Sequence, residues 1–282
     1  MITRFAPSPT GPLHLGHAYS AILAHDMARA AGGKFLLRIE DIDRQRSKPE
    51  WEAQIYDDLR WLGLSWDGPV MRQSERLNIY RQALETLWER DLLFACSCSR
   101  RDIEAAASAP QEGVPLGPDG IVYPGTCRER GAHHPGQPLP QAALRLRMDR
   151  AACDCSFEEI GPAHRGIHHI TRERMIREVG DIVLARREMG TSYHLSVVLD
   201  DAAQGVTLVT RGEDLFEATA IHVTLQKLLE LPTPTYCHHD LIRDEHGKRL
   251  AKRDDARALA KYRTEGATPD DIRRMVGLTP LA

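Results

Sequence analysis

The chain has no apolar run near the roughly 18 residues that a membrane-spanning helix needs, and Met1–Pro7 lack the apolar core of a signal peptide. It also lacks an excess of positive charge, because 37 Lys and Arg stand against 40 Asp and Glu, a net charge of −3. That balance excludes a protein that coats a nucleic-acid backbone with its whole surface. We therefore expect a cytoplasmic protein without membrane contact, in which any basic face is local.

Internal repeats and low-complexity tracts are absent as well. Apolar residues make up 42% of the 282 residues and charged residues 27%, which excludes disordered and fibrous classes. At roughly 150 residues per domain, this length predicts about two compact units. Only six cysteines occur, and their clustering in a reducing compartment favours metal ligation over disulfides: Cys96-x-Cys98, Cys127, Cys153-x-Cys155 and Cys237.

The first forty residues predict a βαβ unit. Residues 2–5 and 34–39 have the apolar character of buried strands, and Gly16–Ala31 carry apolar residues at helical spacing. Ligands of such parallel sheets bind beyond the carboxyl ends of the strands. The loop after residue 5 and Glu40 are therefore candidates for a binding site.

The rest of the chain alternates between regular and loop-rich stretches. Helices are expected at about 49–62 and 74–90, the second with Ser74 as its N-cap and one apolar stripe. Residues 96–140 lack periodicity, as in a loop-rich insertion clamped by a metal. Regular structure then returns in segments that we assign to the second half of the sheet: 143–147, 180–185, 206–210 and a helix over 213–229, followed by two short helical patterns after residue 232.

The loop over residues 6–17 is typical of a phosphate-binding site. Prolines stiffen it, glycines allow close approach of a ligand, and His14 and His17 arrive at the N-terminus of a helix, which attracts anions. The alternatives are a proline-rich turn with incidental histidines and a His-x-x-His zinc pair.

This stretch resembles class I aminoacyl-tRNA synthetases, specifically the glutamyl branch. Residues 4–8 resemble its glutamate loop and His14-Leu15-Gly16-His17 its HIGH signature, which implies that His14, Gly16 and His17 bind ATP. Residues 248–253 resemble the second signature, KMSKS, with Lys252 matching the lysine that neutralises ATP phosphates. Ala251 departs from the serine usual there, and taken alone such a basic segment is more often a solvated turn.

The resemblance also implies an amino-acid pocket. Glu40 matches the residue that holds the substrate ammonium, and Ser8 lines the same loop. Arg4, Tyr193 and Arg211 match the residues that hold the carboxylates, a task suited to the arginine fork. For each residue taken singly, an exposed salt bridge is the competing explanation.

The implied reaction forms no covalent enzyme intermediate. The glutamate carboxylate attacks the α-phosphate of ATP, and the mixed anhydride then acylates a hydroxyl of a nucleic acid. Mg²⁺ with ATP, together with His14, His17 and Lys252, is expected to stabilise the developing charge.

A structural zinc site, one per chain, is implied by the same resemblance. Its ligands would be Cys96, Cys98, Tyr123 and Cys127, with the tyrosine in place of a fourth cysteine. Residue chemistry alone would prefer a more usual zinc ligand in place of the tyrosine, and the candidates are Cys153, Cys155, His133 and His134. A further alternative is that the thiols bind no metal.

The expected fold is α/β, a Rossmann-like parallel sheet of the class I synthetase type that carries a zinc-binding insertion and a small helical C-terminal segment. We divide it into a first catalytic half, the insertion, a second catalytic half, and the KMSKS-like loop with the final helices: residues 1–92, 93–165, 166–235 and 236–282.

Only 30 residues follow Lys252, too few for the helical anticodon-binding domain of full-length glutamyl enzymes. The resemblance thereby narrows to a short branch of the family, which attaches glutamate to the queuosine base in the anticodon loop of tRNA(Asp). The expected partners are ATP, L-glutamate and that tRNA, and we expect a monomer. The alternatives are a truncated conventional synthetase that charges a tRNA 3′ end and a non-catalytic regulatory paralogue, which should have lost a signature histidine, Glu40 or Lys252.

Overall fold

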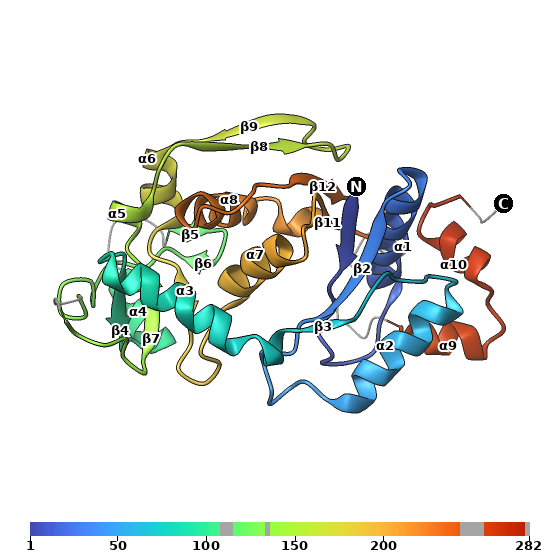
Figure 1. Cartoon of the computed structure of the whole chain (residues 1–282), viewed down its shortest axis with the longest axis horizontal. Helices are drawn as coiled ribbons and strands as arrows, with labels where there is room; N and C mark the ends of the chain where they lie inside the picture. Colours follow the sequence, from blue (N-terminus) through green and yellow to red (C-terminus); the bar gives the residue numbers. More distant parts are fainter. Residues whose placement is uncertain (108–114, 133–135, 243–256, 280–282) are drawn as a thin grey trace.

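A computed structural model describes residues 1–107, 115–132, 136–242 and 257–279 of the chain. The molecule is elongated, with the N-terminal strands and the final helices at one end and the loop-rich region at the other (Figure 1). Among the helices of these ranges, none has both the length and the apolar character that crossing a bilayer requires.

The predicted βαβ unit is confirmed. Strand β1 (Ile2–Phe5) leads through α1 (Leu15–Ala30) to β2 (Lys34–Ile39), and β1 and β2 pair in parallel. A short β3 (Met71–Arg72) adds to β2, also in parallel. The helix buries its small and branched side chains against this sheet, in a core that includes Ala18, Ile22, Phe35 and Leu37.

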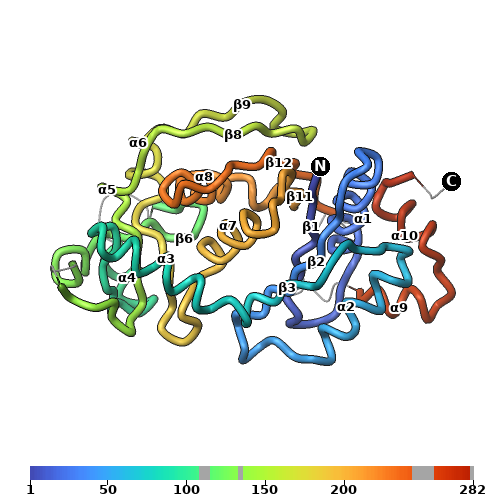
Figure 2. The backbone as a smooth tube through the Cα atoms, in the orientation of Figure 1, coloured from blue at the N-terminus to red at the C-terminus, as the bar shows by residue number. Residues whose placement is uncertain are grey.

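A four-stranded sheet lies beside β1 and is joined to it by a backbone hydrogen bond. Strand β11 (Leu208–Gly212) pairs in parallel with β12 (Thr235–His239), which pairs in parallel with β8 (Cys155–Glu159), and β9 (Gly166–Ile170) closes the edge as an antiparallel strand. Figure 2 shows β1 between β11 and β2.

Two contacts fix the direction of β11 relative to β1. The backbone N–H of Thr207 donates to the Ile2 carbonyl at 2.9 Å, and Arg4 Nη1 donates to the Thr210 carbonyl at 3.1 Å. The two strands therefore run the same way, and their carboxyl ends open at one edge. This is the crevice in which parallel α/β sheets bind ligands.

A separate antiparallel sheet forms the other end of the molecule. Its order is β10 (Val183–Ala185), β7 (Ala143–Leu146) and β4 (Leu93–Cys96). The assignment of residues 143–147 and 180–185 to the second half of the parallel sheet is therefore wrong, because short apolar strands carry no signal of the partner they choose. Smaller elements surround this sheet: α4 (Arg100–Ala107), β5 (Leu116–Gly117), β6 (Gly120–Ile121), α5 (Met148–Ala151), α6 (Arg172–Arg174) and η2 (Met175–Val179).

Helices α2 (Pro49–Trp61), α3 (Leu77–Glu89) and α8 (Thr219–Leu228) lie where helices were expected, the last preceded by η3 (Glu213–Leu215). The N-cap prediction for Ser74 is wrong. That residue lies in η1 (Gln73–Glu75), and its hydroxyl donates to Asp41 at 2.6 Å.

Helix α7 (Tyr193–Ala203) was not expected from the sequence. Its buried Asp200 accepts hydrogen bonds from Gln73, Arg76 and Tyr80, at 2.9, 2.6 and 2.8 Å. These bonds fix α7 against α3 and so set the position of the next residue, Asp201.

The two short helices predicted at the end are α9 (Leu259–Thr264) and α10 (Pro269–Met275). Helix α10 packs beside α1, where the buried Arg273 pairs with Asp26 at 2.7 Å, and α9 lies near α2, where Arg263 pairs with Asp57 at 2.7 Å (Figure 1). The C-terminal segment thereby buttresses the helix that starts at the candidate nucleotide loop.

Candidate active site

The two histidines of the predicted nucleotide loop cap helix α1. His14 is the N-cap, and its Nδ1 accepts the backbone N–H of Gly16 at 3.1 Å. His17 Nδ1 accepts the backbone N–H of His14 at 3.2 Å. Since each Nδ1 accepts a hydrogen bond, each ring in its neutral form carries its proton on Nε2. The loop therefore presents imidazole N–H donors at a helix N-terminus, which suits phosphate.

Gly16 lies close to the first histidine. A Cβ at this position would lie 3.1 Å from His14 Cε1, so the imidazole would have to shift by a few tenths of an ångström to admit a side chain. The loop also reaches the end of β2, since the Glu40 backbone N–H donates to the Pro7 carbonyl at 3.0 Å.

Lys252, Ala251 and the rest of 248–253 lie outside the described residues. The chain on both sides of 243–256 approaches the nucleotide loop. On one side His239 Nε2 lies 2.7 Å from Ser20 Oγ of α1, and on the other Ala258 forms a β-bridge with His14.

A cavity of about 530 Å³ opens beyond the strand ends, and Ser8, Glu40 and Tyr193 line it. Around them the wall includes two arginines, two acidic residues, of which Asp119 lies in the β5–β6 turn, and two residues at the start of α7: Arg46, Arg186, Asp43, Asp119, Ser192 and His194. The insertion therefore contributes to the pocket through Asp119.

Buried charges behind this cavity are paired. Arg38 Nη2 donates to Glu40 Oε1 at 3.2 Å, and its Nη1 donates to Asp201 Oδ1 at 2.7 Å. Arg4 Nε donates to the same Asp201 oxygen at 2.9 Å. Asp201 thus joins the two arginines, and Arg38 orients Glu40.

The pKa shifts follow from this pairing. Burial raises the pKa of Glu40 above its usual value, against the opposing charges of Arg38 and Arg4. Burial acts on Asp201 too, but there Arg4 and Arg38 prevail and hold the pKa below its usual value. Glu40 is therefore the carboxylate of the pair that acid neutralises first.

Tyr193 brings the predicted carboxylate-binding residues together. Burial raises the pKa of its phenol, and the charges of Arg211, Glu40 and Arg4 all act on that group. Of the five residues predicted to bind glutamate, Ser8, Glu40 and Tyr193 therefore line one cavity, and the buried Arg4 and Arg211 lie near enough to Tyr193 for their charges to act on it.

Arg38 and Asp201 were not among the predicted site residues. The sequence did contain a signal for Arg38, because this cation lies between the apolar residues Leu37 and Ile39 of a predicted strand. A charge buried in such a strand requires a partner of opposite charge. Asp201 carried no comparable signal, because its helix was not expected and its partners lie 163 and 197 residues away in the chain.

The cysteine cluster lies at the other end of the molecule, where β4 ends. Sγ atoms of Cys96, Cys98 and Cys127 all lie within 4.8 Å of one another. Tyr123 Oη lies 3.5 Å from Cys96 Sγ and 3.4 Å from Cys98 Sγ. Tetrahedral zinc, with Zn–S bonds of about 2.3 Å, needs ligand atoms about 3.8 Å apart. The donor set therefore fits zinc in both spacing and chemistry.

Of the rival ligands, Cys155 lies elsewhere, at the start of β8 with its Sγ 3.9 Å from Thr224 Oγ1. Within the described residues, Cys153 joins no group of ligating side chains. His133 and His134 lie outside the described residues.

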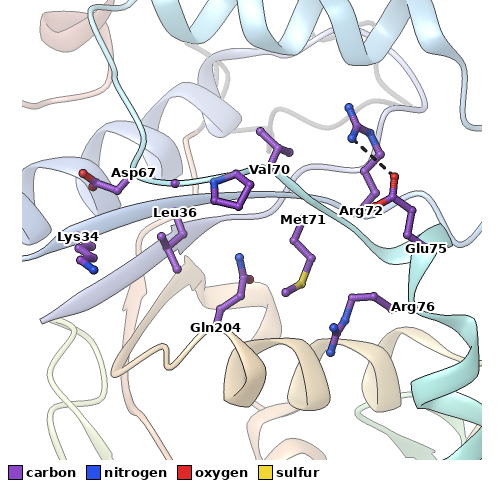
Figure 3. Close-up of a pocket in the computed structure, with 11 residues that line it drawn as sticks. Lys34, Leu36, Asp67, Val70, Met71, Arg72, Glu75, Arg76 and Gln204 are labelled. Carbon is purple, nitrogen blue, oxygen red and sulfur yellow. Dashed lines mark ion pairs between the residues drawn. The ribbon is translucent and has the colours of Figure 1, made fainter.

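A second cavity, of about 460 Å³, lies between β2, β3 and the end of α7 (Figure 3). Lys34 and Met71 line it, as do Arg72 and Glu75, which form an ion pair at 3.7 Å (Figure 3). None of the predicted site residues lines it. Gln204 links it to the site, because this residue accepts a hydrogen bond from Arg38 at 3.0 Å.

Comparison with known proteins agrees with this geometry. Residues 1–280 match the family described as class I tRNA synthetases (E and Q), catalytic domain. A glutamyl-Q tRNA(Asp) synthetase of Rhodobacter capsulatus is 77% identical over 278 residues, which cover 99% of this chain and 100% of the relative. One of Nocardia farcinica is 43% identical, over 98% of this chain and 85% of the relative.

Among solved structures, a glutamate tRNA ligase of Elizabethkingia meningosepticum in complex with its amino acid has a TM-score of 0.76 at 28% identity. The match covers 98% of this chain and 60% of the ligase, so the chain spans well under two thirds of that protein. The expected Rossmann-like α/β fold is confirmed. This chain belongs to the class I tRNA synthetases for glutamate and glutamine, within their glutamyl-Q tRNA(Asp) synthetase branch, and is a ligase.

Proposed function

We propose that this chain activates L-glutamate with ATP to form glutamyl-adenylate and transfers the glutamate to the queuosine base in the anticodon loop of tRNA(Asp). The observation that carries the proposal is the pocket beyond the strand ends. The Glu40 carboxyl lies at its wall beside Ser8 and Tyr193, and the cations of Arg4 and Arg211 act on this wall. Glutamate carries one ammonium group and two carboxylates, which this charge pattern complements.

In the pocket, Glu40 would accept the substrate ammonium, and Arg38 would hold the Glu40 carboxylate in place. Arg4, Tyr193 and Arg211 would bind the carboxylates, as the family resemblance implies. Positioning is the main contribution of such a site, because it turns an encounter of two anions into an in-line attack.

In the first step a substrate α-carboxylate oxygen attacks the α-phosphorus of ATP. The bond from that phosphorus to the bridging oxygen breaks, and pyrophosphate leaves with the electron pair. His14 and His17, with protons on Nε2, would donate to the phosphates, and Lys252 would add a positive charge. Mg²⁺ bound with ATP would supply further charge neutralisation.

In the second step a hydroxyl of the queuosine cyclopentene diol attacks the carbonyl carbon of the adenylate. An ester bond forms, AMP leaves, and the hydroxyl proton passes to solvent. A terminal ribose offers similar vicinal hydroxyls, so the chemistry alone does not choose between the two acceptors. The choice of queuosine is supported by the 77% identity to a glutamyl-Q tRNA(Asp) synthetase.

Structural zinc held by Cys96, Cys98, Tyr123 and Cys127 is part of the proposal. It would tie β4 to the chain that carries the β5–β6 turn, and the closed donor set gives it a structural role. The proposed insertion spans residues 93–165. Strand β8 lies within this range and pairs with β12 of the parallel sheet.

The test is transfer of radiolabelled glutamate to tRNA(Asp) with and without queuosine. We expect labelling only of the queuosine-containing tRNA, and we expect the label to survive removal of the 3′-terminal adenosine. Label that is lost with that adenosine, or equal charging of tRNA(Glu), would identify a shortened conventional synthetase instead.

A further inference from the structure

A network of buried histidines lies behind the proposed carboxylate site. Arg211 donates from Nε to His238 Nε2 at 2.9 Å and from Nη1 to His222 Nδ1 at 2.8 Å. Its Nη2 donates to Thr219 Oγ1 at 2.7 Å. All four side chains are buried. Three of the five guanidinium N–H groups are thus engaged with described residues, which leaves two for a carboxylate.

The proton positions in this network follow from one rule, because an arginine only donates hydrogen bonds. The ring nitrogen of His238 that faces Arg211 must therefore be unprotonated, and the His238 proton lies on Nδ1. That nitrogen is 2.5 Å from Glu159 Oε2. Burial and the Arg211 charge lower the pKa of His238 against the effect of Glu159, so the ring stays neutral.

Glu159 is itself held rigidly. Its Oε1 accepts the backbone N–H groups of His238 at 2.9 Å and of Gly161 at 2.6 Å. Both carboxylate oxygens are therefore acceptors, one for the backbone and one for the imidazole. A fixed acceptor at this place admits only the Nδ1-protonated tautomer of His238.

The same rule extends the network to the pocket wall. His222 Nδ1 accepts from Arg211, so His222 Nε2 donates to His194 Nδ1, at 3.1 Å. His194 Nε2 then donates to Asp119 Oδ1, at 3.2 Å. Every donor in this branch points away from Arg211, which is consistent with a single arrangement of protons around that side chain.

We propose that Glu159 is a positioning residue for substrate binding: by fixing the tautomer of His238, it holds Arg211 in the orientation that receives a carboxylate of the substrate. This role rests on the proposed function, since it takes Arg211 as a glutamate-binding residue. Glu159 itself is fully buried and does not line the cavity, and in the described part of the chain its carboxylate hydrogen-bonds to His238 and Gly161.

The informative variant is Glu159→Gln, which keeps the size and shape of the side chain. Its Oε1 would still accept the two backbone N–H groups, while its NH₂ group would face His238 Nδ1. His238 would then carry its proton on Nε2, opposite the N–H of Arg211, and that hydrogen bond would be lost. We expect the glutamate KM in ATP–pyrophosphate exchange to rise at least about 10-fold, with the ATP KM within about 2-fold.

Glu158→Gln is the matched control. Glu158 precedes Glu159 on β8 but lies on the exposed face, where it accepts from Thr235 Oγ1 at 3.0 Å. The same chemical change at this neighbouring position should leave the glutamate KM, the ATP KM and the melting temperature at wild-type values.

A second readout does not depend on activity. In ¹⁵N-histidine NMR spectra, His238 of the wild-type protein should be protonated on Nδ1, and in the Glu159→Gln variant on Nε2. A wild-type His238 protonated on Nε2 or on both nitrogens would overturn the inference. So would a Glu159→Gln variant with an unchanged glutamate KM, or one in which both KM values and the melting temperature change together.

Failure of the proposed function gives a different pattern. The wild-type protein would then show the expected tautomer but no glutamate-dependent exchange, which would overturn the role of Glu159 together with that of Arg211. If the wild-type protein catalyses the exchange and the Glu159→Gln variant has the same glutamate KM, the role of Glu159 alone would be overturned.

Discussion

Two regions of the molecule balance their charges in opposite ways. One is the pocket beyond the parallel strands, and the other is the cysteine cluster at the far end of the molecule. In the pocket, Asp201 lies between Arg4 and Arg38, and Arg38 also pairs with Glu40, so this chain supplies both signs of charge. In the cluster, three thiols and a phenol face one another, and their deprotonation would place like charges side by side. The charges of the pocket are therefore paired once the chain folds, whereas the deprotonated form of the cluster would need a bound cation.

This difference predicts which changes affect glutamate activation, and the largest effect is expected at Glu40. Glu40→Gln removes the negative charge that would hold the substrate ammonium, while the side chain keeps its size. We expect kcat/KM for glutamate in ATP–pyrophosphate exchange to fall about 10²–10³-fold, on the order of 3–4 kcal/mol. A variant that retains wild-type kcat/KM would show that the ammonium binds elsewhere.

A change at Asp201 should damage both the site and the fold. Asp201→Asn leaves the buried Arg4 and Arg38 without their shared carboxylate, and breaking such a pair costs about 3–5 kcal/mol of stability. In the fraction that stays folded, we expect kcat/KM for glutamate to fall about 10–100-fold because both arginines lose their orientation. Urea denaturation and exchange kinetics check the two effects separately, and wild-type values in both would contradict the pairing.

Acid should weaken glutamate activation through Glu40. Burial raises the Glu40 pKa above 4.5, so this group takes up its proton at a higher pH than a free glutamate side chain does. The protonated form does not attract an ammonium ion, and kcat/KM should therefore fall about tenfold per pH unit below that pKa. Asp201, with a lowered pKa, stays ionised in this range. In Glu40→Gln this limb of the profile should be absent; its persistence would assign the titration to another group.

The smallest effect on activation is expected at the cysteine cluster. Cys127→Ser should abolish stoichiometric zinc and lower the melting temperature, while exchange in the folded protein changes by less than about threefold, below about 1 kcal/mol. Elemental analysis and exchange kinetics provide the measurement. Full zinc retention would point to a ligand set without Cys127, and a loss of exchange as large as that of Glu40→Gln would remove the contrast between the two regions.

The sequence predicted the parts of the fold and site that depend on local pattern. Apolar periodicity located β1, α1 and β2, and so placed His14 and His17 at the N-terminus of a helix, which they cap. The partners of the buried charges were not predictable in this way. Asp201 reaches Arg4 only because α3 holds α7 in place, a tertiary contact that leaves no periodic trace in either segment.

Strand partners were hardest to predict. Residues 183–185 look like any short buried strand, and the sequence does not show that they pair with β7 and not with β11. The prediction that Ser74 caps a helix was wrong for a related reason. The Ser74 hydroxyl donates a hydrogen bond to Asp41, which is 33 residues away in the chain.

The central claim is that this pocket activates glutamate with the charges of the chain itself. Glutamate-dependent exchange between ATP and pyrophosphate, measured on purified protein without tRNA, tests it most directly. The account predicts exchange with L-glutamate and none with L-lysine, whose side chain would bring a positive charge toward Arg4 and Arg211. Absence of exchange at millimolar L-glutamate in a folded sample would contradict the account.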